Sequence, residues 1–386
     1  MSRFIIRRIV RAFVALLLFQ ASLFGLIHSL PYDFSVFVSF GGSPNNRVFV
    51  QSYYGLDLPF LEQLFNWWVN FFKFDLGESF LHWPTPVSEI LLTRMPRTLL
   101  LFLSATILAY VLGFWLGKTI AWRRGTLLEF GLTLGGVAGY TSFAPWLGFV
   151  AINIFGWYLG WLPYQRLVNP NIWFNAPITI DYLLVRMVIS AIVILTGLYL
   201  LNTFTRKMKE RPRRLVLRIG GYFFIAITLL VWWQRSGISR YALDVLDHLA
   251  LPLGTVVLLS FGESMMLIRM SMLETMREDY VLTARAKGLS ENVIRDRHVA
   301  RNAILPVITR MLLNLPFVLV GSLAIELVFM WHGMGKTLFD AIEFQDIPML
   351  MGILSVTGII LLCAHVLLDI LYVYLDPRLR FRSETT

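Results

Sequence analysis

The chain has 386 residues, a formal net charge of +10, 57% hydrophobic residues and only 15% charged residues. Its mean hydropathy of +0.66, together with uncharged runs near the ~20 residues that cross a bilayer, excludes a soluble globular domain. We therefore predict an all-α polytopic membrane protein. The single cysteine, Cys363, excludes an intramolecular disulfide and a cysteine metal site, and we expect it to be a small packed apolar residue.

The first predicted span covers residues 9–30. Four arginines precede its apolar run, and no small-x-small cleavage pattern follows it, so we expect a retained helix and not a removed signal. A polar and aromatic segment then reaches residue 94. The second predicted span, residues 98–117, ends at three basic residues: Lys118, Arg123 and Arg124.

Residues 130–162 form an uncharged run that is too long for one straight span. Pro145 and the glycines around it predict a bend or a short interfacial piece there.

Two further runs, residues 187–204 and 219–234, flank a connector with seven Lys/Arg and one acidic residue. The positive-inside rule predicts that both runs cross and that the connector is cytoplasmic, while a lipid-binding or regulatory role is the alternative.

Residues 249–268, 311–330 and 349–375 complete eight predicted spans. With the amino terminus inside, 25 of the 34 Lys/Arg lie on the cytoplasmic side, eight of them from Arg269 to Arg310, so we expect both termini to be cytoplasmic.

A basic segment, residues 279–306, separates two of these spans. Tyr280 to Lys287 are good helix formers, Gly288 can adopt the left-handed conformation that ends a helix, and Ser290 can cap a second helix. We predict two short helices broken at Gly288, the second over residues 291–302. The apolar residues of this second helix lie among arginines, so one face can rest on protein or lipid.

Around TARAKGLS the basic segment resembles the cytoplasmic EAA loop of the dipeptide/oligopeptide family of ABC importer permeases. The matching residues are Asp279, Tyr280, Thr283, Ala284, Arg285, Ala286, Lys287, Gly288, Leu289, Ser290, Arg301, Asn302, Ala303, Leu305 and Pro306. The departure from the broader permease pattern is at Leu282 and Thr283, where Glu and Ala would begin the motif. An ordinary basic loop is the alternative, but it does not explain the Gly and Leu-Pro placement.

In that family the loop docks into a cleft of the ATPase subunit. The resemblance therefore implies that one run of residues couples to the ATPase: Ala284, Arg285, Ala286, Lys287, Gly288, Leu289, Ser290 and Glu291. Residues 55–68, 74–80, 160–163, 321–352 and 367–381 also resemble the family. The resemblance leaves out residues 181–247, which we interpret as an added helix hairpin.

The expected organisation has five parts. They are an arm and first helix (1–30), an extracytoplasmic region (31–94), helices two and three with an outer loop (95–180), the inserted hairpin (181–247) and a permease core (248–386) with a coupling loop at 271–306.

Three carboxylates lie inside predicted spans: Glu263, Glu326 and Asp369. Because an ionised carboxylate in lipid costs several kcal/mol, such residues usually face the bundle interior or water. Glu263 could contact the amino group of a passing peptide, or pair with Arg269 or His365. Glu326 and Asp369 recur in the family pattern, and for them we favour a role in packing or in a gate.

No catalytic pattern is present in the sequence. Residues 333–337 read GxGKT, the end of a phosphate-binding loop, but Met330 stands at the required first glycine and no strand precedes it. We expect an outer loop there. The histidines lack metal spacing, and neither HExxH nor Gly-x-Ser-x-Gly occurs. We expect no enzyme activity, no metal and no cofactor in this chain.

The resemblance implies a type I ABC importer permease for di- or oligopeptides in the inner membrane. Its expected partners are a second homologous permease, two ATPase subunits that bind ATP and Mg²⁺, an extracytoplasmic binding protein and membrane lipid, without nucleic acid. Nickel complexes, opines or oligosaccharides are alternative substrates. An ion-coupled transporter using Glu263, Asp369 and His365, or a membrane scaffold, is the alternative from another class.

Overall fold

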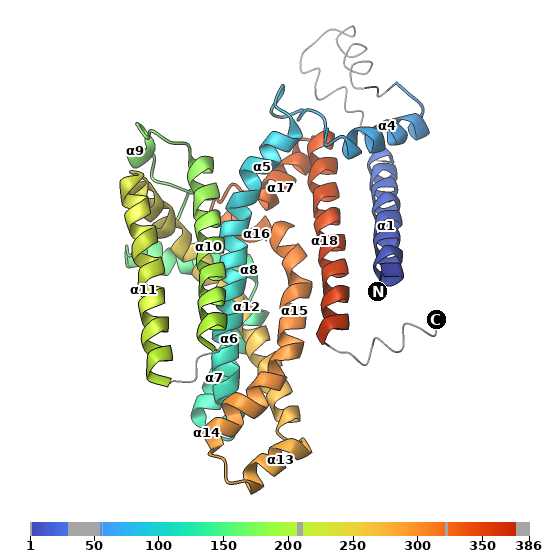
Figure 1. Cartoon of the computed structure of the whole chain (residues 1–386). Coiled ribbons are helices and arrows are strands. Elements are labelled where there is room, and N and C mark those ends of the chain that lie inside the picture. The colour runs from blue at the N-terminus through green and yellow to red at the C-terminus, as the bar shows by residue number, and fades with distance from the viewer. Residues whose placement is uncertain (1, 30–54, 56, 207–210, 321–322, 376–386) are drawn as a thin grey trace.

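The computed structural model describes residues 2–29, 55, 57–206, 211–320 and 323–375. Within these ranges the regular structure is helical, apart from one isolated bridge between Glu78 and Pro86. Long helices run side by side between two ends of the molecule (Figure 1). One end carries α13 (Asp279–Ala286) and α14 (Glu291–Val293), and the other carries α4 (Phe60–Phe72) and α17 (Met334–Glu343).

Six helical stretches of the described chain are long and apolar enough to cross a membrane. They belong to α1 (Ser2–His28), α5 with α6 (Val87–Thr98 and Ser104–Trp122), α10 (Ile180–Arg206), α11 (Arg211–Arg235), α12 (Ser239–Thr275) and α18 (Ile347–Leu375). A π-helical segment, Leu99–Leu103, joins α5 to α6. The prediction that the membrane-spanning structure is helical is confirmed.

The bend predicted within residues 130–162 is confirmed. The helix α7 (Leu127–Thr141) meets α8 (Ala144–Ala151) and its π-helical continuation (Ile152–Tyr158) at 109°. The break falls at Ser142 and Phe143, whose backbones are extended. Pro145 lies in the first turn of α8, where a helix tolerates proline because that N–H has no helical partner.

The count of eight spans stays a prediction. Within the described part of the chain, the six stretches become seven if the bent pair crosses as one span. The remaining predicted span, residues 311–330, falls on α15 (Ala300–Val320) and α16 (Leu323–Val328), and residues 321–322 between them lie outside the described ranges.

The long helix α12 occupies the centre of the fold and packs closely on α6. A Cβ atom at Gly117 of α6 would lie 1.8 Å from Cγ2 of Ile268 and 2.5 Å from the carbonyl oxygen of Met265. Ser264 Oγ also donates a hydrogen bond of 3.0 Å to the carbonyl of Ala109. Small residues therefore allow the two backbones to approach, as is typical of helix pairs in membranes.

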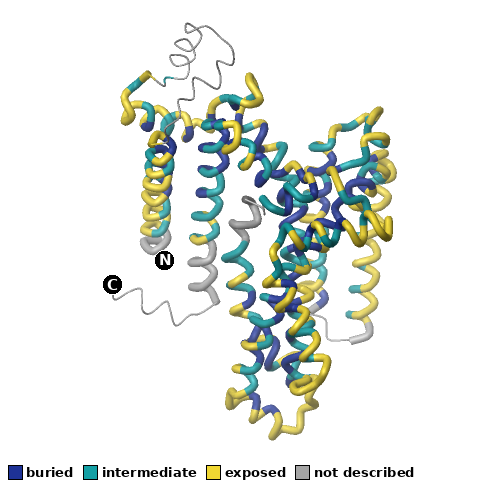
Figure 2. Tube along the Cα trace, turned by 180° about the vertical axis from the view of Figure 1, so that it is seen from behind, coloured by how far each residue is buried: buried dark blue, intermediate teal, exposed yellow. Residues whose placement is uncertain are grey.

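The hairpin α10–α11 lies at the edge of the molecule (Figure 1), and no residue in the most apolar part of α11 is buried (Figure 2). Its two helices are joined by the Arg186 guanidinium, which lies 4.4 Å from the Tyr182 ring centroid and 5.2 Å from that of Trp232. Arg97 of α5 pairs with Asp181 of α10 at 2.5 Å. The hairpin is thus tied to the core at the end of the molecule that carries α17 (Figure 1).

The expectation that Cys363 is packed is wrong. Its side chain is exposed on α18. Cys363 lies within the apolar stretch of α18, residues 347–366. A small apolar side chain that faces hydrocarbon needs no burial inside the protein, so its exposure there costs no free energy.

The close approach of α6 and α12 gives a prediction. Gly117→Ala should lower the free energy of unfolding by about 1–3 kcal/mol, because the added methyl group meets the α12 backbone. Gly135→Ala in α7 is the matched control, since a Cβ there has no neighbour within 4 Å, and it should be neutral or stabilising. Thermal unfolding in detergent measures both variants, and equal midpoints would contradict the packing argument.

Candidate functional site: the basic segment and the cavity above it

The basic segment forms a helical corner in which Gly288 is the turning point. The helix α13 ends at Ala286, and Gly288 has φ of +71°, the left-handed conformation that was predicted for it. The chain continues through α14, a π-helical segment (Ile294–Val299) and α15. The predicted break is confirmed.

Two details of the predicted second helix are wrong. Ser290 occupies the N-cap position, but its side chain makes no capping bond; its carbonyl accepts from the N–H of Val293 at 2.9 Å. The helix does not end near residue 302, because the chain continues through Pro306 as α15. Membrane helices tolerate such prolines because neighbouring groups and local adjustments satisfy the freed backbone.

The corner buries one apolar side and exposes the other. Val281, Ala284, Ile294 and Val299 are buried in a cluster with residues of α6, α12 and α15. Seven of the eight residues predicted to couple are exposed: Arg285, Ala286, Lys287, Gly288, Leu289, Ser290 and Glu291. Of the eight, only Ala284 points inward. The exposed residues are therefore available to another subunit at the end of the molecule.

Polar contacts fix the corner to the helices around it. Lys118 Nζ at the end of α6 lies 3.2 Å from Asp296, and the Arg295 guanidinium lies 2.8 Å from the same carboxylate. The hydrogen bond from Arg295, followed by Lys118, lowers the pKa of Asp296 to about 2, so Asp296 stays ionised at physiological pH. Asn302 donates to the hydroxyl of Tyr280 at 2.7 Å, which links α13 to α15. Sequence reasoning missed both links.

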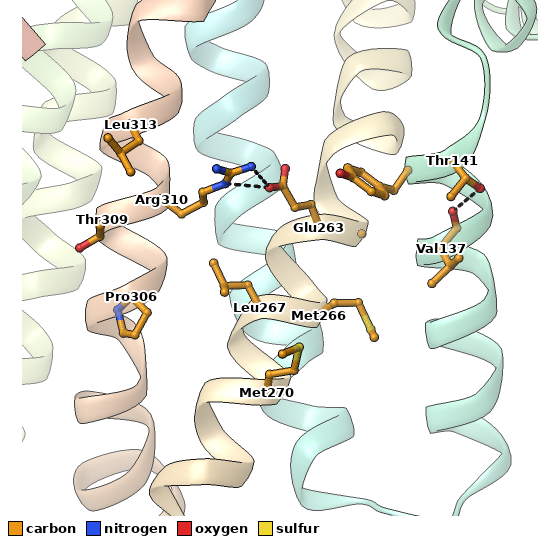
Figure 3. A pocket seen from close by; sticks show the side chains of 12 residues that line it. Val137, Thr141, Glu263, Met266, Leu267, Met270, Pro306, Thr309, Arg310 and Leu313 are labelled. Carbon is orange, nitrogen blue, oxygen red and sulfur yellow. Dashed lines mark hydrogen bonds and ion pairs between the residues drawn. The ribbon is translucent and has the colours of Figure 1, made fainter. Parts of the chain in front are cut away.

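A cavity of about 650 Å³ lies between α7, α12 and α15 (Figure 3). Glu263 of α12 and Arg310 of α15 point toward one another in its wall, with 2.9 Å between Arg310 Nε and Glu263 Oε1. The side chains of Glu263 and Arg310 are 29% and 51% exposed. The rest of the lining is mostly apolar, with Met266, Leu267 and Met270 among its residues.

The partners predicted for Glu263 are wrong. Arg269 pairs instead with Glu129 of α7, at 3.1 Å from Nε, and His365 contacts the carbonyl of Leu361 in its own helix at 2.8 Å. Arg310 had been counted among the cytoplasmic charges. Its signal in the sequence is that Glu263 lies about four helical turns before the basic segment and Arg310 about one turn after it, on the two helices that the segment joins.

Glu326 has a different environment. It is fully buried and accepts hydrogen bonds of 2.8 Å from Thr98 Oγ1 and from the backbone N–H of Lys336. The N–H of Met334 donates to Thr98 Oγ1 at 2.7 Å. The carboxylate therefore fixes the start of α17 against α5, which supports a packing role. The side chain of Asp369 lies outside the described residues.

The GxGKT residues surround this carboxylate. A Cβ at Gly333 would lie 2.5 Å from Glu326 Oε1, and Lys336 Nζ pairs with Asp340 at 2.7 Å. The glycine is needed for close packing on Glu326, not for a phosphate. The expectation of an outer loop here is wrong about the secondary structure, because residues 334–343 form the helix α17.

The buried carboxylate gives a prediction. Glu326→Ala should lower the free energy of unfolding by about 1–3 kcal/mol, because two donors lose their acceptor inside the protein. Glu326→Gln keeps one acceptor and the side-chain volume, so its loss should be smaller. Thermal unfolding in detergent measures the series; wild-type stability of Glu326→Ala would contradict an anchoring role.

Comparisons with known proteins agree with this architecture. Residues 215–381 match a family model described as "Binding-protein-dependent transport system inner membrane component", and residues 1–102 match that of its N-terminal part. The di/tripeptide transport system permease protein DppB of Pseudomonas aeruginosa is 33% identical over 330 residues, covering 84% of this chain and 82% of the relative. The oligopeptide transport system permease protein AppB of Bacillus subtilis is 28% identical over 328 residues, covering 85% and 83%.

The interpretation of residues 181–247 as an added helix hairpin stays a prediction. The first family match begins at residue 215, inside α11. A protein of Brucella abortus is 28% identical over 382 residues, covering 99% of this chain and 100% of the relative, so the hairpin falls within the aligned region. The chain therefore belongs to the family of binding-protein-dependent transport system inner membrane components, and it is a multi-pass permease subunit.

Proposed function

We propose that this chain is the permease subunit of an ABC importer for short peptides, with both termini in the cytoplasm. The observation that carries the proposal is the exposed helical corner at Gly288, which is packed onto membrane helices that line a cavity. The names of relatives from Pseudomonas aeruginosa and Bacillus subtilis support di-, tri- and oligopeptides as the substrate class.

The proposed complex contains a second homologous permease, two ATPase subunits and an extracytoplasmic binding protein. ATP and Mg²⁺ bind to the ATPases, and this chain carries no cofactor and performs no covalent chemistry. The exposed residues from Arg285 to Glu291 would contact the ATPase. Membrane lipid covers exposed apolar faces such as that of α11, where Phe223 and Phe224 are among the most exposed side chains.

Coupling follows from how the corner is held. A displacement of α13 and α14 by the ATPases reaches α6 through Lys118 and Asp296, and α15 through Tyr280 and Asn302. The buried cluster transmits the same displacement to α12. Packed elements of this kind move as rigid bodies, so opening and closing ATPases would alternate the access of the pathway.

The geometry disfavours the ion-coupled alternative. A relay needs titratable groups within hydrogen-bonding reach of one another, but Glu263 pairs with Arg310 and His365 contacts its own helix. An importer for nickel complexes, opines or oligosaccharides would use a binding protein that binds that substrate. The ligand of the binding protein therefore distinguishes these substrates from peptides.

The energy source gives a direct test. The complex in proteoliposomes, with loaded binding protein outside and ATP inside, should accumulate radiolabelled peptide, and collapsing the proton gradient should leave uptake within about twofold of the original rate. ATP hydrolysis supplies the work in this account, so the gradient contributes nothing. Peptide uptake that needs the gradient and ignores ATP would favour the ion-coupled alternative.

Coupling through the corner gives a second test. Gly288→Val should leave the permease expressed and inserted, but stimulation of ATP hydrolysis by loaded binding protein should fall about tenfold. A β-branched residue at φ of +71° is strained by about 1–3 kcal/mol or redirects α14.

Ser290→Ala is the matched control, because the serine side chain makes no capping bond, and it should retain stimulation. Normal stimulation in Gly288→Val would show that this corner does not couple to the ATPases.

A further inference from the structure

The Glu263–Arg310 pair lies on a face that is unsuited to lipid. Both helices lead away from the corner, and Glu263 and Arg310 lie about three turns from the end of α12 and from the start of α15, respectively. A half-exposed guanidinium in hydrocarbon is costly, so such groups face water or protein in membrane bundles. The face of α11 differs, because its exposed residues there are apolar. The cavity at Glu263 therefore opens toward water or a partner subunit.

We propose that this cavity is a binding site for the transported peptide as a zwitterion, with Glu263 receiving the ammonium group and Arg310 the carboxylate. The proposal rests on the proposed peptide-import function and adds a recognition site to it. Arg310 presents a planar fork of donors, which suits a carboxylate, and Glu263 offers acceptor oxygens that suit an ammonium group.

Charge balance favours a zwitterion over a ligand with one charge. Binding would exchange one ion pair within the protein for two between protein and ligand, so each charge keeps a partner. A ligand with a single charge would leave Glu263 or Arg310 without a partner in a mostly apolar cavity, which is less favourable than two ion pairs. The pair thus recognises the two groups that all short peptides with free termini share.

The apolar lining suits the parts of peptides that vary. Met266, Leu267 and Met270 follow one another along α12 below Glu263, and Figure 3 shows them beside the ion pair. Thioether side chains are flexible and polarizable, so they adapt to ligands of different shape. The volume of about 650 Å³ falls in the range of small-molecule sites. Fixed charges and adaptable side chains together give recognition that is independent of sequence.

The test uses the complete importer in proteoliposomes, with radiolabelled Ala-Ala and Ala-Ala-Ala as probes. The double variant Glu263→Gln/Arg310→Gln keeps a hydrogen-bonding pair between α12 and α15 but removes both charges. Stimulation of ATP hydrolysis by loaded binding protein should stay within about twofold of wild type, while peptide uptake per ATP should fall by about tenfold or more. Glu129→Gln is the matched control, since it breaks another ion pair between transmembrane helices, and its uptake should be unchanged.

The outcomes separate the two proposals. If wild type accumulates neither peptide, the proposed function fails and the site fails with it. If wild type accumulates peptide and the double variant does so equally well, only the site is overturned. Loss of ATPase stimulation together with uptake would also overturn it, because the pair would then act as a link between helices.

Cross-linking gives a measurement that leaves both charges in place. With the photoreactive residue benzoylphenylalanine at Met266, radiolabelled Ala-Ala-Ala delivered by the binding protein should form an adduct that excess unlabelled peptide suppresses. The same residue at Phe223, on the exposed face of α11, should form none. No adduct at Met266 in an importer that transports the peptide would contradict the proposal.

Discussion

The apolar cluster beneath the basic segment is the contact on which the rest of the permease depends. It brings Val281 and Ala284 of α13 together with Ile268 and Met272 of α12, and it continues into α15. Without it the corner would be an exposed loop, free to move without moving the membrane helices. Because of this cluster, α12 and α15 pack together with the corner as one unit. The close approach of α6 at Gly117 then adds a third helix to that unit.

Two carboxylates inside the helical bundle show how environment assigns a role. Glu326 is fully buried and its hydrogen bonds go to backbone and to Thr98, so it holds α17 in place. Glu263 is partly exposed, faces a cavity and pairs with a half-exposed partner, Arg310. A fully satisfied group is costly to disturb, whereas a partly exposed ion pair can exchange partners at small cost. The first therefore suits structure and the second suits a changing ligand.

Local patterns in the sequence predicted the features that depend on neighbouring residues. Gly288 could be predicted to turn the chain, and the uncharged run at residues 130–162 could be predicted to bend, because backbone preference and span length decide both. Features set by distant residues could not be predicted. Arg310 was taken for a loop charge, since only the folded arrangement of α12 and α15 places it opposite Glu263. The helix α17 was missed because its start is fixed by a carboxylate from α16.

Movement of the basic segment should reach the cavity through α12 and α15, and this transmission can be measured directly. Spin labels at Met266→Cys and Leu313→Cys, in a Cys363→Ser background, report the distance between these helices at the cavity. In the assembled importer this distance should differ between the nucleotide-free and ATP-bound states, and Gly288→Val should abolish the difference. A distance that is the same in both states of the wild-type importer, while transport proceeds, would contradict the claim.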